Sequence, residues 1–204
     1  MLGTEDEPGI MVLTLQELFN SVDKFSAERE YKIKLWYLEI YNENIRDLLT
    51  NTDEYLDLRE DPTKGIIISN INEITVNSCK DVIHLLKKGN KNRTQEPTNA
   101  NETSSRSHAI LQVQVEYKDK ITGIDAEIRI GKLSLIDLAG SERASATNNR
   151  GIRLIEGANI NRSLLTLGTC INVLCEANEK GTKPHVPYRD SKLTRLLKDS
   201  LGGN

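Results

Sequence analysis

The stretch Lys132-Leu133-Ser134-Leu135-Ile136-Asp137-Leu138-Ala139-Gly140 decides the fold class. It predicts a buried strand that ends in an acid, with a glycine in the turn that follows. In open α/β sheets ligands bind beyond the carboxyl ends of strands, where an aspartate can hold Mg²⁺ through water and a glycine lets its N–H approach a phosphate. An ordinary turn after a strand has the same pattern, so D-x-x-G alone leaves both interpretations open.

The neighbouring segments predict a single α/β unit around this strand. Residues 107–117 alternate apolar and polar side chains and a turn follows near Thr122-Gly123, which predicts a hairpin with the strand that ends at Asp137. Residues 32–41 are apolar on both faces, which is typical of a central strand covered on two sides. Its two predicted faces are Ile33, Leu35 and Tyr37, and Trp36, Leu38 and Ile40.

The rest of the chain predicts helices and short strands. A capping box at Thr14-Leu15-Gln16-Glu17 predicts the start of one helix, and Ser78 starts another that ends at Gly89. Residues 44–49 are expected to form a helical turn, and residues 55–76 two or three short strands. After a polar loop over 139–149, we expect one long helix and one shorter helix that stops at Gly202-Gly203.

The composition is that of an ordinary globular domain. Of 204 residues, 37% are hydrophobic and 28% charged, which excludes a collagen-like, disulfide-scaffold or disordered chain. No apolar run is long enough to span a membrane, and residues 1–8 are acidic, unlike a signal peptide, so a cytosolic protein is predicted. The 3 cysteines and 3 histidines lack metal-ligand spacing, which favours free thiols that are buried or half-buried.

The formal net charge of −3 hides a gradient along the chain. Residues 1–100 hold 18 acids and 12 bases, giving −6, whereas residues 143–204 hold 5 acids and 10 bases, giving +5. Such asymmetry indicates that the last third meets an acidic partner. A solvated face whose cations only keep the protein soluble would have the same composition.

A second polar cluster, Asn101-Glu102-Thr103-Ser104-Ser105-Arg106-Ser107-His108, precedes the 107–117 strand. Hydroxyl oxygens suit Mg²⁺ and phosphate, and Arg106 can pair with Glu142 to join the two polar loops. A Ser/Thr-rich turn that leads into a strand is the alternative interpretation.

Together the two strings resemble a known family. Asn101-x-x-Ser104-Ser105-Arg106-Ser107-His108 and, one hairpin later, Asp137-Leu138-Ala139-Gly140-Ser141-Glu142 resemble switch I and switch II of the kinesin motor domain. Residues 36–49 and 185–197 are kinesin-like as well, so the resemblance covers essentially the whole chain. Residues 89–95 and 141–145 look most like the kinesin-8 class.

The resemblance implies a microtubule-stimulated ATPase that uses ATP and Mg²⁺. Ser105 would be a direct Mg²⁺ ligand, Asp137 a ligand through water, and the N–H of Gly140 the sensor of the γ-phosphate. Arg106 and Glu142 would close over the nucleotide as a salt bridge. The implied catalytic residues are Ser104, Ser105, Arg106, Asp137, Gly140 and Glu142, and the implied cofactor-binding residues are Asn101, Ser104, Ser105, Asp137 and Gly140, with Asn159 supporting the loops.

The resemblance also gives the basic last third a partner, because tubulin is strongly acidic. Arg189, Lys192 and Arg195 follow one another at spacings of three, which predicts one helix that presents them on one face. Ala158 stands where several family members carry a lysine, so one contact of the family is not expected here. The implied microtubule contacts are Arg162, Lys183, His185, Arg189, Lys192 and Arg195, with Arg153 and Lys64 as weaker candidates.

One part of a kinesin is missing, because the sequence has no P-loop string GxxxxGK[ST]. The chain therefore resembles a partial motor domain over residues 1–204, with switch I at 101–108, switch II at 137–142 and the microtubule-binding region at about 153–201. The implied fold class is α/β, a kinesin-type P-loop NTPase fold whose central mixed β-sheet is flanked by helices and lacks its N-terminal strands. An exposed sheet edge and little ATPase activity of the chain alone are expected.

These inferences predict a tubulin partner, no nucleic-acid or membrane partner, and a location in the cytoplasm on the microtubule cytoskeleton, the spindle included. They leave the oligomeric state open and are compatible with a homodimer. One alternative is a non-catalytic microtubule-binding module with a kinesin-like fold and no P-loop upstream. Another is a different P-loop NTPase, which would share D-x-x-G but not the serine-rich string.

Overall fold

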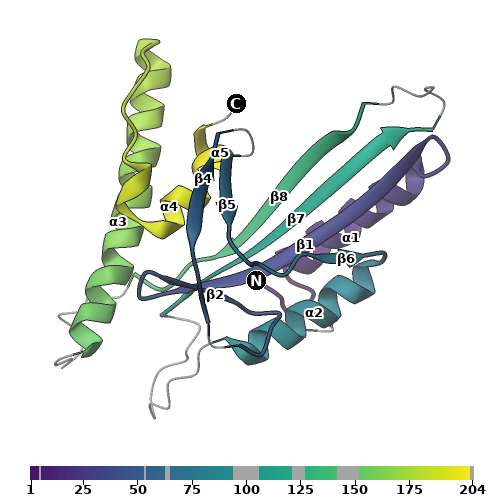
Figure 1. Cartoon of the computed structure of the whole chain (residues 1–204), viewed down its shortest axis with the longest axis horizontal. Coiled ribbons are helices and arrows are strands. Elements are labelled where there is room, and N and C mark those ends of the chain that lie inside the picture. The colour runs from purple at the N-terminus through teal and green to yellow at the C-terminus, as the bar shows by residue number, and fades with distance from the viewer. Residues whose placement is uncertain are drawn as a thin grey trace.

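The computed structural model describes residues 1–4, 6–52, 54–62, 65–93, 106–120, 127–141 and 152–202, apart from the side chains of residues 152–154 and 156. Groups of strands lie between helices along the chain, and the presence of both kinds of element agrees with the predicted α/β class (Figure 1). The strands are β1 (Arg29–Tyr41), β2 (Asn44–Asp47), β3 (Tyr55–Leu56), β4 (Leu58–Asp61), β5 (Gly65–Ile68), β6 (Ile74–Val76), β7 (His108–Asp119) and β8 (Arg129–Asp137). The helices are α1 (Ile10–Phe25), α2 (Cys79–Asn92), α3 (Ile152–Lys180), α4 (Lys192–Leu196) and α5 (Lys198–Gly202), with a 3₁₀ turn, η3 (Tyr188–Asp190), before α4.

The main sheet is built around β1, as its two apolar faces predict. Its order is β3-β2-β1-β7-β8, with β6 also paired to β1, and β4 and β5 form a separate two-stranded sheet. Every pairing between the described strands is antiparallel. The register sets Ala109 opposite Asp137, so the start of β7 and the end of β8 lie at the same end of the sheet.

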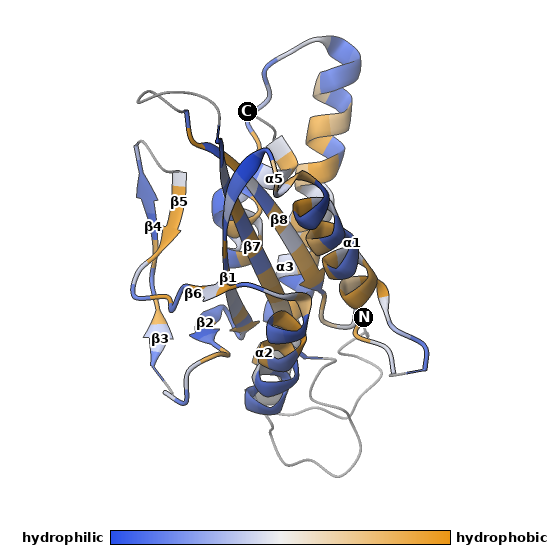
Figure 2. Ribbon diagram, turned by 90° about the vertical axis from the view of Figure 1, so that its right-hand side faces the viewer, coloured by the Kyte–Doolittle hydropathy of each residue, from blue (hydrophilic) through white to orange (hydrophobic). Residues whose placement is uncertain are grey.

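Helices cover both faces of the sheet and create two cores. The odd-numbered face of β1, including Leu35 and Tyr37, packs with α1 and α2, whose buried residues include Leu15 and Leu86. The even-numbered face packs with the C-terminal helices, which supply Leu193, Leu196 and Leu197. Figure 2 shows hydrophobic colour on the sides of α1 and α2 that meet the sheet. The predicted partition of Ile33, Leu35 and Tyr37 from Trp36, Leu38 and Ile40 is confirmed, because side chains alternate across a strand.

The strand β8 differs from its predicted burial. Its first half is exposed and its second half is half-buried, with Ile130 58% exposed. The reason is its place at the end of the sheet order, where β7 is its partner within the described residues. The expected exposed sheet edge is therefore present at β8.

One element type and two helix boundaries also differ from expectation. Residues 44–47 form strand β2 and not a helical turn, because Asn42 and Glu43 adopt positive φ angles of 50° and 59° and fold the chain back as a tight hairpin. The first helix starts at Ile10 with Gly9 as its N-cap, so Thr14 lies inside α1. The Ser78 cap is confirmed, since its Oγ accepts from the Asp81 N–H at 3.2 Å, but α2 continues to Asn92.

The C-terminal region contains the expected long helix, α3, with 29 residues. The expected shorter helix is instead two short helices, α4 and α5, that follow the 3₁₀ turn η3. Of the free cysteines, Cys170 is buried and Cys79 half-buried as expected, whereas Cys175 is exposed. No helix within the described ranges is long and apolar enough to cross a membrane.

Candidate functional site

The candidate site lies where α2 ends beside the start of β7 and the end of β8. Close packing brings α2 there, because Gly89 touches the Tyr37 ring so tightly that an added Cβ would overlap it. The Tyr37 hydroxyl donates to Asn90 Oδ1 at 2.7 Å, and Asn92 Nδ2 donates to the Leu48 carbonyl at 2.9 Å. The last turn of α2 is therefore anchored to the sheet on two sides, and this anchoring positions the next residue, Arg93.

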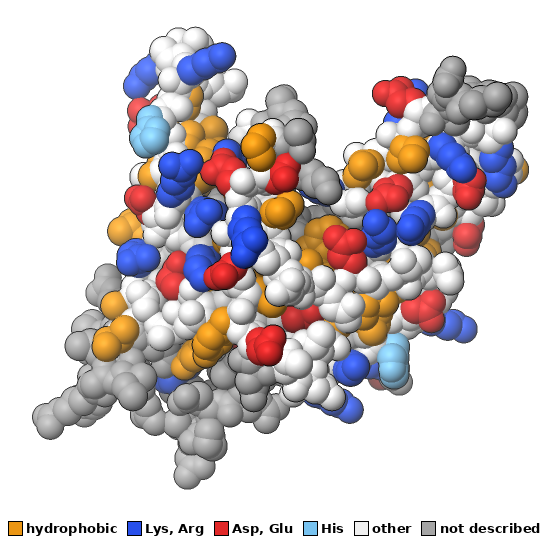
Figure 3. Space-filling model, viewed as in Figure 1, with side chains coloured by type: hydrophobic (Ala, Val, Ile, Leu, Met, Phe, Trp, Pro, Cys, Tyr) orange, Lys and Arg blue, Asp and Glu red, His pale blue; other side chains and the backbone are white. Residues whose placement is uncertain are grey.

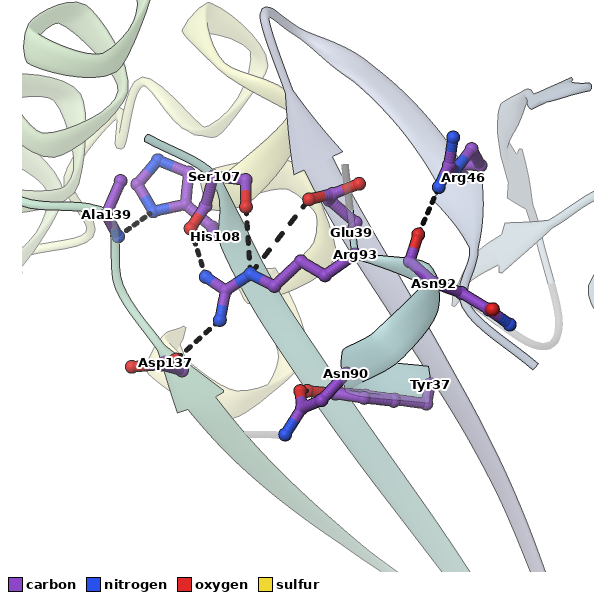
Figure 4. Close-up of polar contacts among 10 residues, drawn as sticks. All are labelled: Tyr37, Glu39, Arg46, Asn90, Asn92, Arg93, Ser107, His108, Asp137 and Ala139. Atoms are coloured by element: carbon purple, nitrogen blue, oxygen red, sulfur yellow. Dashed lines mark hydrogen bonds and ion pairs between the residues drawn. The ribbon is translucent and has the colours of Figure 1, made fainter. Parts of the chain in front are cut away.

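Arg93 is the centre of the polar network drawn in Figure 4. Its guanidinium donates to Asp137 Oδ2 at 2.7 Å, to Ser107 Oγ at 2.9 Å and to the Ser107 carbonyl at 2.5 Å. Its Nε also lies 4.0 Å from Glu39 Oε1. Arg93 is 7% exposed and Glu39 1% exposed, so this is a buried cation held between carboxylates by a planar fork of donors.

This network joins the two strings that the sequence singled out. Ser107 belongs to the serine-rich string before β7, and Asp137 opens the D-x-x-G string after β8. Because Ala109 and Asp137 face each other in the antiparallel ladder, the strings are neighbours in space although one hairpin separates them in sequence. A ligand that binds to either string would therefore lie close to the other string as well.

His108 forms a second connection between the strings. Its Nδ1 accepts from the Ala139 N–H at 3.0 Å, and its Nε2 lies 2.8 Å from Ser163 Oγ on α3. His108 is 2% exposed, and burial, followed by the nearby Arg93 charge, lowers the pKa of His108 to about 4 against a smaller opposing effect of Asp137. The ring is therefore neutral near pH 7.

The predicted catalytic residues fall into two groups. Asp137 is half-buried at the end of β8, Gly140 is half-buried two residues past the exposed Leu138, and Arg106 is half-buried just before β7. These described residues lie at the same end of the sheet. The remaining predicted residues of the nucleotide site, Asn101, Ser104, Ser105 and Glu142, lie outside the described residues, so their roles and the Arg106–Glu142 salt bridge stay predictions.

Asn159, predicted to support the loops, holds α3 to the sheet. Its Nδ2 donates to Asn42 Oδ1 at 2.5 Å in the turn between β1 and β2. A second bond from the same turn runs from the Lys192 N–H to Glu43 Oε2 at 2.9 Å. This turn, which directly precedes the residues expected to form a helical turn, is thus an anchor for both α3 and α4.

The predicted microtubule contacts belong to α3, η3, α4 and the segment between α3 and η3, and Figure 3 shows many Lys and Arg side chains over α3, α4 and the β4–β5 hairpin. Arg162, Lys183, His185 and Arg189 are exposed, whereas Lys192 and Arg195 are half-buried. The expectation of one helix for Arg189, Lys192 and Arg195 is wrong, because Ser191 is the N-cap of α4 and Arg189 lies before it in η3. Of the weaker candidates, Lys64 and the Arg153 side chain lie outside the described residues.

This basic surface contains an acid that sequence reasoning did not use. Glu60 on β4 contacts Arg189 at 3.2 Å and Lys198 at 2.7 Å, and these cations lower the pKa of Glu60. Glu60 and Arg189 also line a groove shared with His185 and Arg195. The β4–β5 hairpin is therefore attached to the C-terminal helices through charge.

Sequence reasoning also missed Arg93, Glu39 and Ser163. A signal existed for Glu39, an acid in a strand that is otherwise apolar on both faces, because a charge buried at such a position needs a partner. Arg93 could not be paired with it from sequence, since α2 brings it to the sheet from 54 residues away along the chain. Ser163 is one hydroxyl in a long helix, and only the packing of α3 shows its role.

The comparisons with known proteins agree with this geometry. Residues 1–204 match the family model described as "Kinesin motor domain", so the chain belongs to the kinesin motor domain family. It is 58% identical over its whole length to the kinesin-like protein KIF19 of Xenopus laevis and 52% identical to KIF18A of Mus musculus. It is 53% identical over 99% of its length to KIP3 of Saccharomyces cerevisiae, and these relatives are of the kinesin-8 class, as the resemblance predicted.

Solved structures confirm the fold class. The chain is similar to KIF14 bound to a microtubule with ADP, with a TM-score of 0.90 and 38% identity, and to a KIF14 dimer bound to a microtubule with AMP-PNP, with a TM-score of 0.87. It covers 59% and 58% of those chains. It spans 20% of the KIF19 relative and 23% of the KIF18A relative.

Proposed function

We propose that this chain supplies the nucleotide switches and the microtubule face of a microtubule-based motor that hydrolyses ATP. The observation that carries the proposal is the direct bridge from Arg93 to Ser107 and Asp137, which joins the end of the serine-rich string to the start of the D-x-x-G string. Two strings held together at one end of a sheet can respond jointly to a phosphate bound between them.

The described part of the proposed nucleotide site fits Mg²⁺ and ATP. The Asp137 side chain is 36% exposed at the end of β8, and Arg93 contacts its Oδ2, so the carboxylate is both oriented and reachable. Carboxylate oxygen is a preferred Mg²⁺ ligand, and Mg²⁺ when bound would neutralise phosphate charge. Asp137 would hold the ion through water, Ser105 would ligate it directly, and Asn101 and Ser104 would contact the nucleotide.

Catalysis at such a site consists of positioning and electrostatic stabilisation. In this proposal the N–H of Gly140 binds the γ-phosphate, and Arg106 and Glu142 close the two switches over it as a salt bridge. Loss of the phosphate would release these contacts and change how the strings are held. Because His108 and Asn159 connect this region to α3, a change at the strings can reach that helix.

The basic surface supports a microtubule as the partner. Exposed cations occur on α3, on η3 and in the segment between them, the view in Figure 3 shows many Lys and Arg side chains over this part of the molecule, and tubulin would present an acidic surface to them. The proposed contacts are Arg162, Lys183, His185, Arg189, Lys192 and Arg195. The corresponding location is the microtubule cytoskeleton.

The test is the ATPase rate of the complete protein that carries this chain, measured with and without microtubules. Stimulation by microtubules is expected, and Arg106→Ala or Glu142→Ala should lower the stimulated rate by about 10²-fold or more, the usual cost of removing a group that stabilises the transition state. A matched control is Arg29→Ala, which removes a partly exposed ion pair with Asp119 at the other end of the sheet. Wild-type stimulation in both switch variants would contradict the assigned roles.

The same measurement separates the motor from a non-catalytic microtubule-binding module. A module would bind microtubules with a salt-sensitive affinity but give no ATP turnover in the complete protein. If the complete protein both binds microtubules and hydrolyses ATP, the result supports the motor.

A further inference from the structure

His108 joins three parts of the molecule, and the role inferred for it below rests on the proposed function. His108 is the first residue of β7, Ala139 follows β8 in the D-x-x-G string, and Ser163 lies in α3. Their exposed fractions are 2%, 5% and 1%, so water does not compete for the hydrogen bonds between them.

The hydrogen-bond partners of His108 determine which of its two ring nitrogens carries the proton. A backbone N–H can only donate, so His108 Nδ1 must accept from Ala139 at 3.0 Å and the single proton of the neutral ring sits on Nε2. Nε2–H then donates to Ser163 Oγ at 2.8 Å, and the Ser163 hydroxyl donates to the Ile160 carbonyl at 2.8 Å. Each group has a partner, and the chain of bonds runs in one direction from the D-x-x-G string into the helix.

This chain of hydrogen bonds can transmit a movement of the D-x-x-G string to α3. The residue after Ala139 is Gly140, whose N–H is the proposed phosphate contact, so a movement of Gly140 pulls on the Ala139 N–H directly. The imidazole is a rigid ring with a bond at each nitrogen, so it passes that movement to Ser163 and cannot absorb it by rotating a single bond. Ser163 adjoins the exposed Arg162 in α3, which is a proposed microtubule contact.

We propose that His108 and Ser163 are positioning residues that couple the D-x-x-G string to α3, so that the nucleotide state sets the affinity for the microtubule. Neither residue needs to touch the nucleotide or tubulin. Asn159, bonded to Asn42, holds α3 one turn before Ser163 and provides a fixed point about which the helix can move.

The measured quantity is a coupling ratio, the microtubule dissociation constant of the complete protein with ADP divided by that with AMP-PNP. Ser163→Ala removes the acceptor on the helix but keeps a good helix former. His108→Asn keeps an acceptor near the Nδ1 position for Ala139 and lacks the reach to Ser163. Each should lower the ratio about fivefold, the effect of losing one buried hydrogen bond.

The matched control is Thr166→Ala on the same helix. The Thr166 hydroxyl is also buried and donates to its own helix, at the Arg162 carbonyl at 2.8 Å, but it is not part of the His108 chain. This variant should keep the wild-type ratio. The double variant His108→Asn/Ser163→Ala should lower the ratio no further than either single change, because both remove the same connection.

The outcomes separate this proposal from the proposed function. A wild-type ratio well above one that persists in Ser163→Ala and His108→Asn overturns the coupling role and leaves the motor proposal intact. A fall in Thr166→Ala equal to that in Ser163→Ala also overturns it, since general weakening of α3 would then be the cause. A wild-type ratio of one overturns the coupling role, and the ATPase measurement described above then decides the proposed function separately. If His108→Asn fails to fold, the comparison of Ser163→Ala with Thr166→Ala decides.

Discussion

At the scale of single residues, Arg93 is the most deeply buried cation in the part of the chain that the structure describes. It lies between Asp137 and Glu39. A buried ion pair of this kind adds little net stability, but removing one of its partners costs much free energy because the other charge stays buried. The three hydrogen bonds from Arg93 to Ser107 and Asp137 depend on the planar guanidinium. A lysine has the charge but not that geometry.

Arg93→Ala in the complete protein is therefore expected to lower the free energy of unfolding by about 3 to 5 kcal/mol, because it removes the cation from beside the buried Glu39 and the half-buried Asp137. Arg93→Lys should recover only part of this loss. Urea denaturation at pH 7 measures both. The partly exposed pair Arg29–Asp119 serves as the control, where Arg29→Ala should lower the denaturation midpoint much less than Arg93→Ala does. If Arg93→Ala and Arg29→Ala lowered the free energy of unfolding equally, the burial of Arg93 would have no energetic consequence.

His108 makes stability depend on pH in a defined window. Its folded-state pKa of about 4 lies below the ordinary histidine value of 6.5, so between those values the unfolded chain binds a proton that the folded chain does not. Stability is therefore unaffected above pH 7 and falls as the pH drops from about 6.5 toward 4. From pH 7 to pH 5 the loss should be about 2 kcal/mol.

The measurement is the free energy of unfolding of the wild type and of His108→Asn at pH 7 and at pH 5. An asparagine side chain has no titrating proton, so the variant should be less stable at pH 7 but should lose about 2 kcal/mol less on acidification. An identical pH dependence of the two proteins would mean that His108 is not held neutral in the folded state.

At the scale of elements, the β4–β5 hairpin and the C-terminal helices act as one surface because Glu60 holds Arg189 and Lys198. These are surface ion pairs, with Arg189 83% exposed, and they add little stability. They instead change the electrostatic potential of this surface, because the negative charge of Glu60 offsets part of the positive charge that would attract an acidic partner.

Glu60→Gln should therefore tighten microtubule binding by the complete protein about two- to fivefold at low salt, because it removes one repulsive charge and releases two cations. The gain should shrink as salt rises and screens exposed charges. Cosedimentation at about 50 and 200 mM KCl tests this dependence. Glu30→Gln, which breaks an exposed pair with Lys118 on the sheet, is the matched control and should leave affinity unchanged. Weaker binding by Glu60→Gln would indicate that Glu60 itself contacts the partner.

At the scale of the whole molecule, the main sheet of the described residues has an exposed edge, and the sequence contains no P-loop string. Among the described strands the sheet order ends at β8, and Ile128 and Ile130 are 61% and 58% exposed there. No P-loop string occurs in the sequence, although P-loop backbone groups and lysine hold the phosphates in P-loop NTPases. The chain also covers only 58% of the KIF14 motor chain to which it is similar.

The 204-residue chain alone is accordingly expected to hydrolyse Mg-ATP no faster than buffer, since positioning of the phosphates is most of the catalysis. A phosphate-release assay with microtubules present is the measurement. Its control is the complete protein under the same conditions. Turnover by the isolated chain that disappears in Asp137→Asn would contradict the expectation.

The sequence alone was sufficient to predict those features that depend on residues close together in the chain. The period of two in residues 32–41 predicted both faces of β1, the Ser78 cap predicted the start of α2, and the two polar strings indicated the family. These features depend on side-chain alternation, on capping hydrogen bonds and on motif spacing, all of which act over a few residues.

Only the tertiary structure decided which groups meet. Glu39, Arg93 and Asp137 come from three elements, and their contacts exist because α2 packs closely on β1 and because β7 and β8 pair in one register. The hairpin at Asn42 and Glu43 overrode the helical signal of residues 44–49, since pairing with β1 satisfies those backbone groups. The bond from His108 to Ser163 likewise spans 55 residues, and no short-range pattern encodes contacts at that separation.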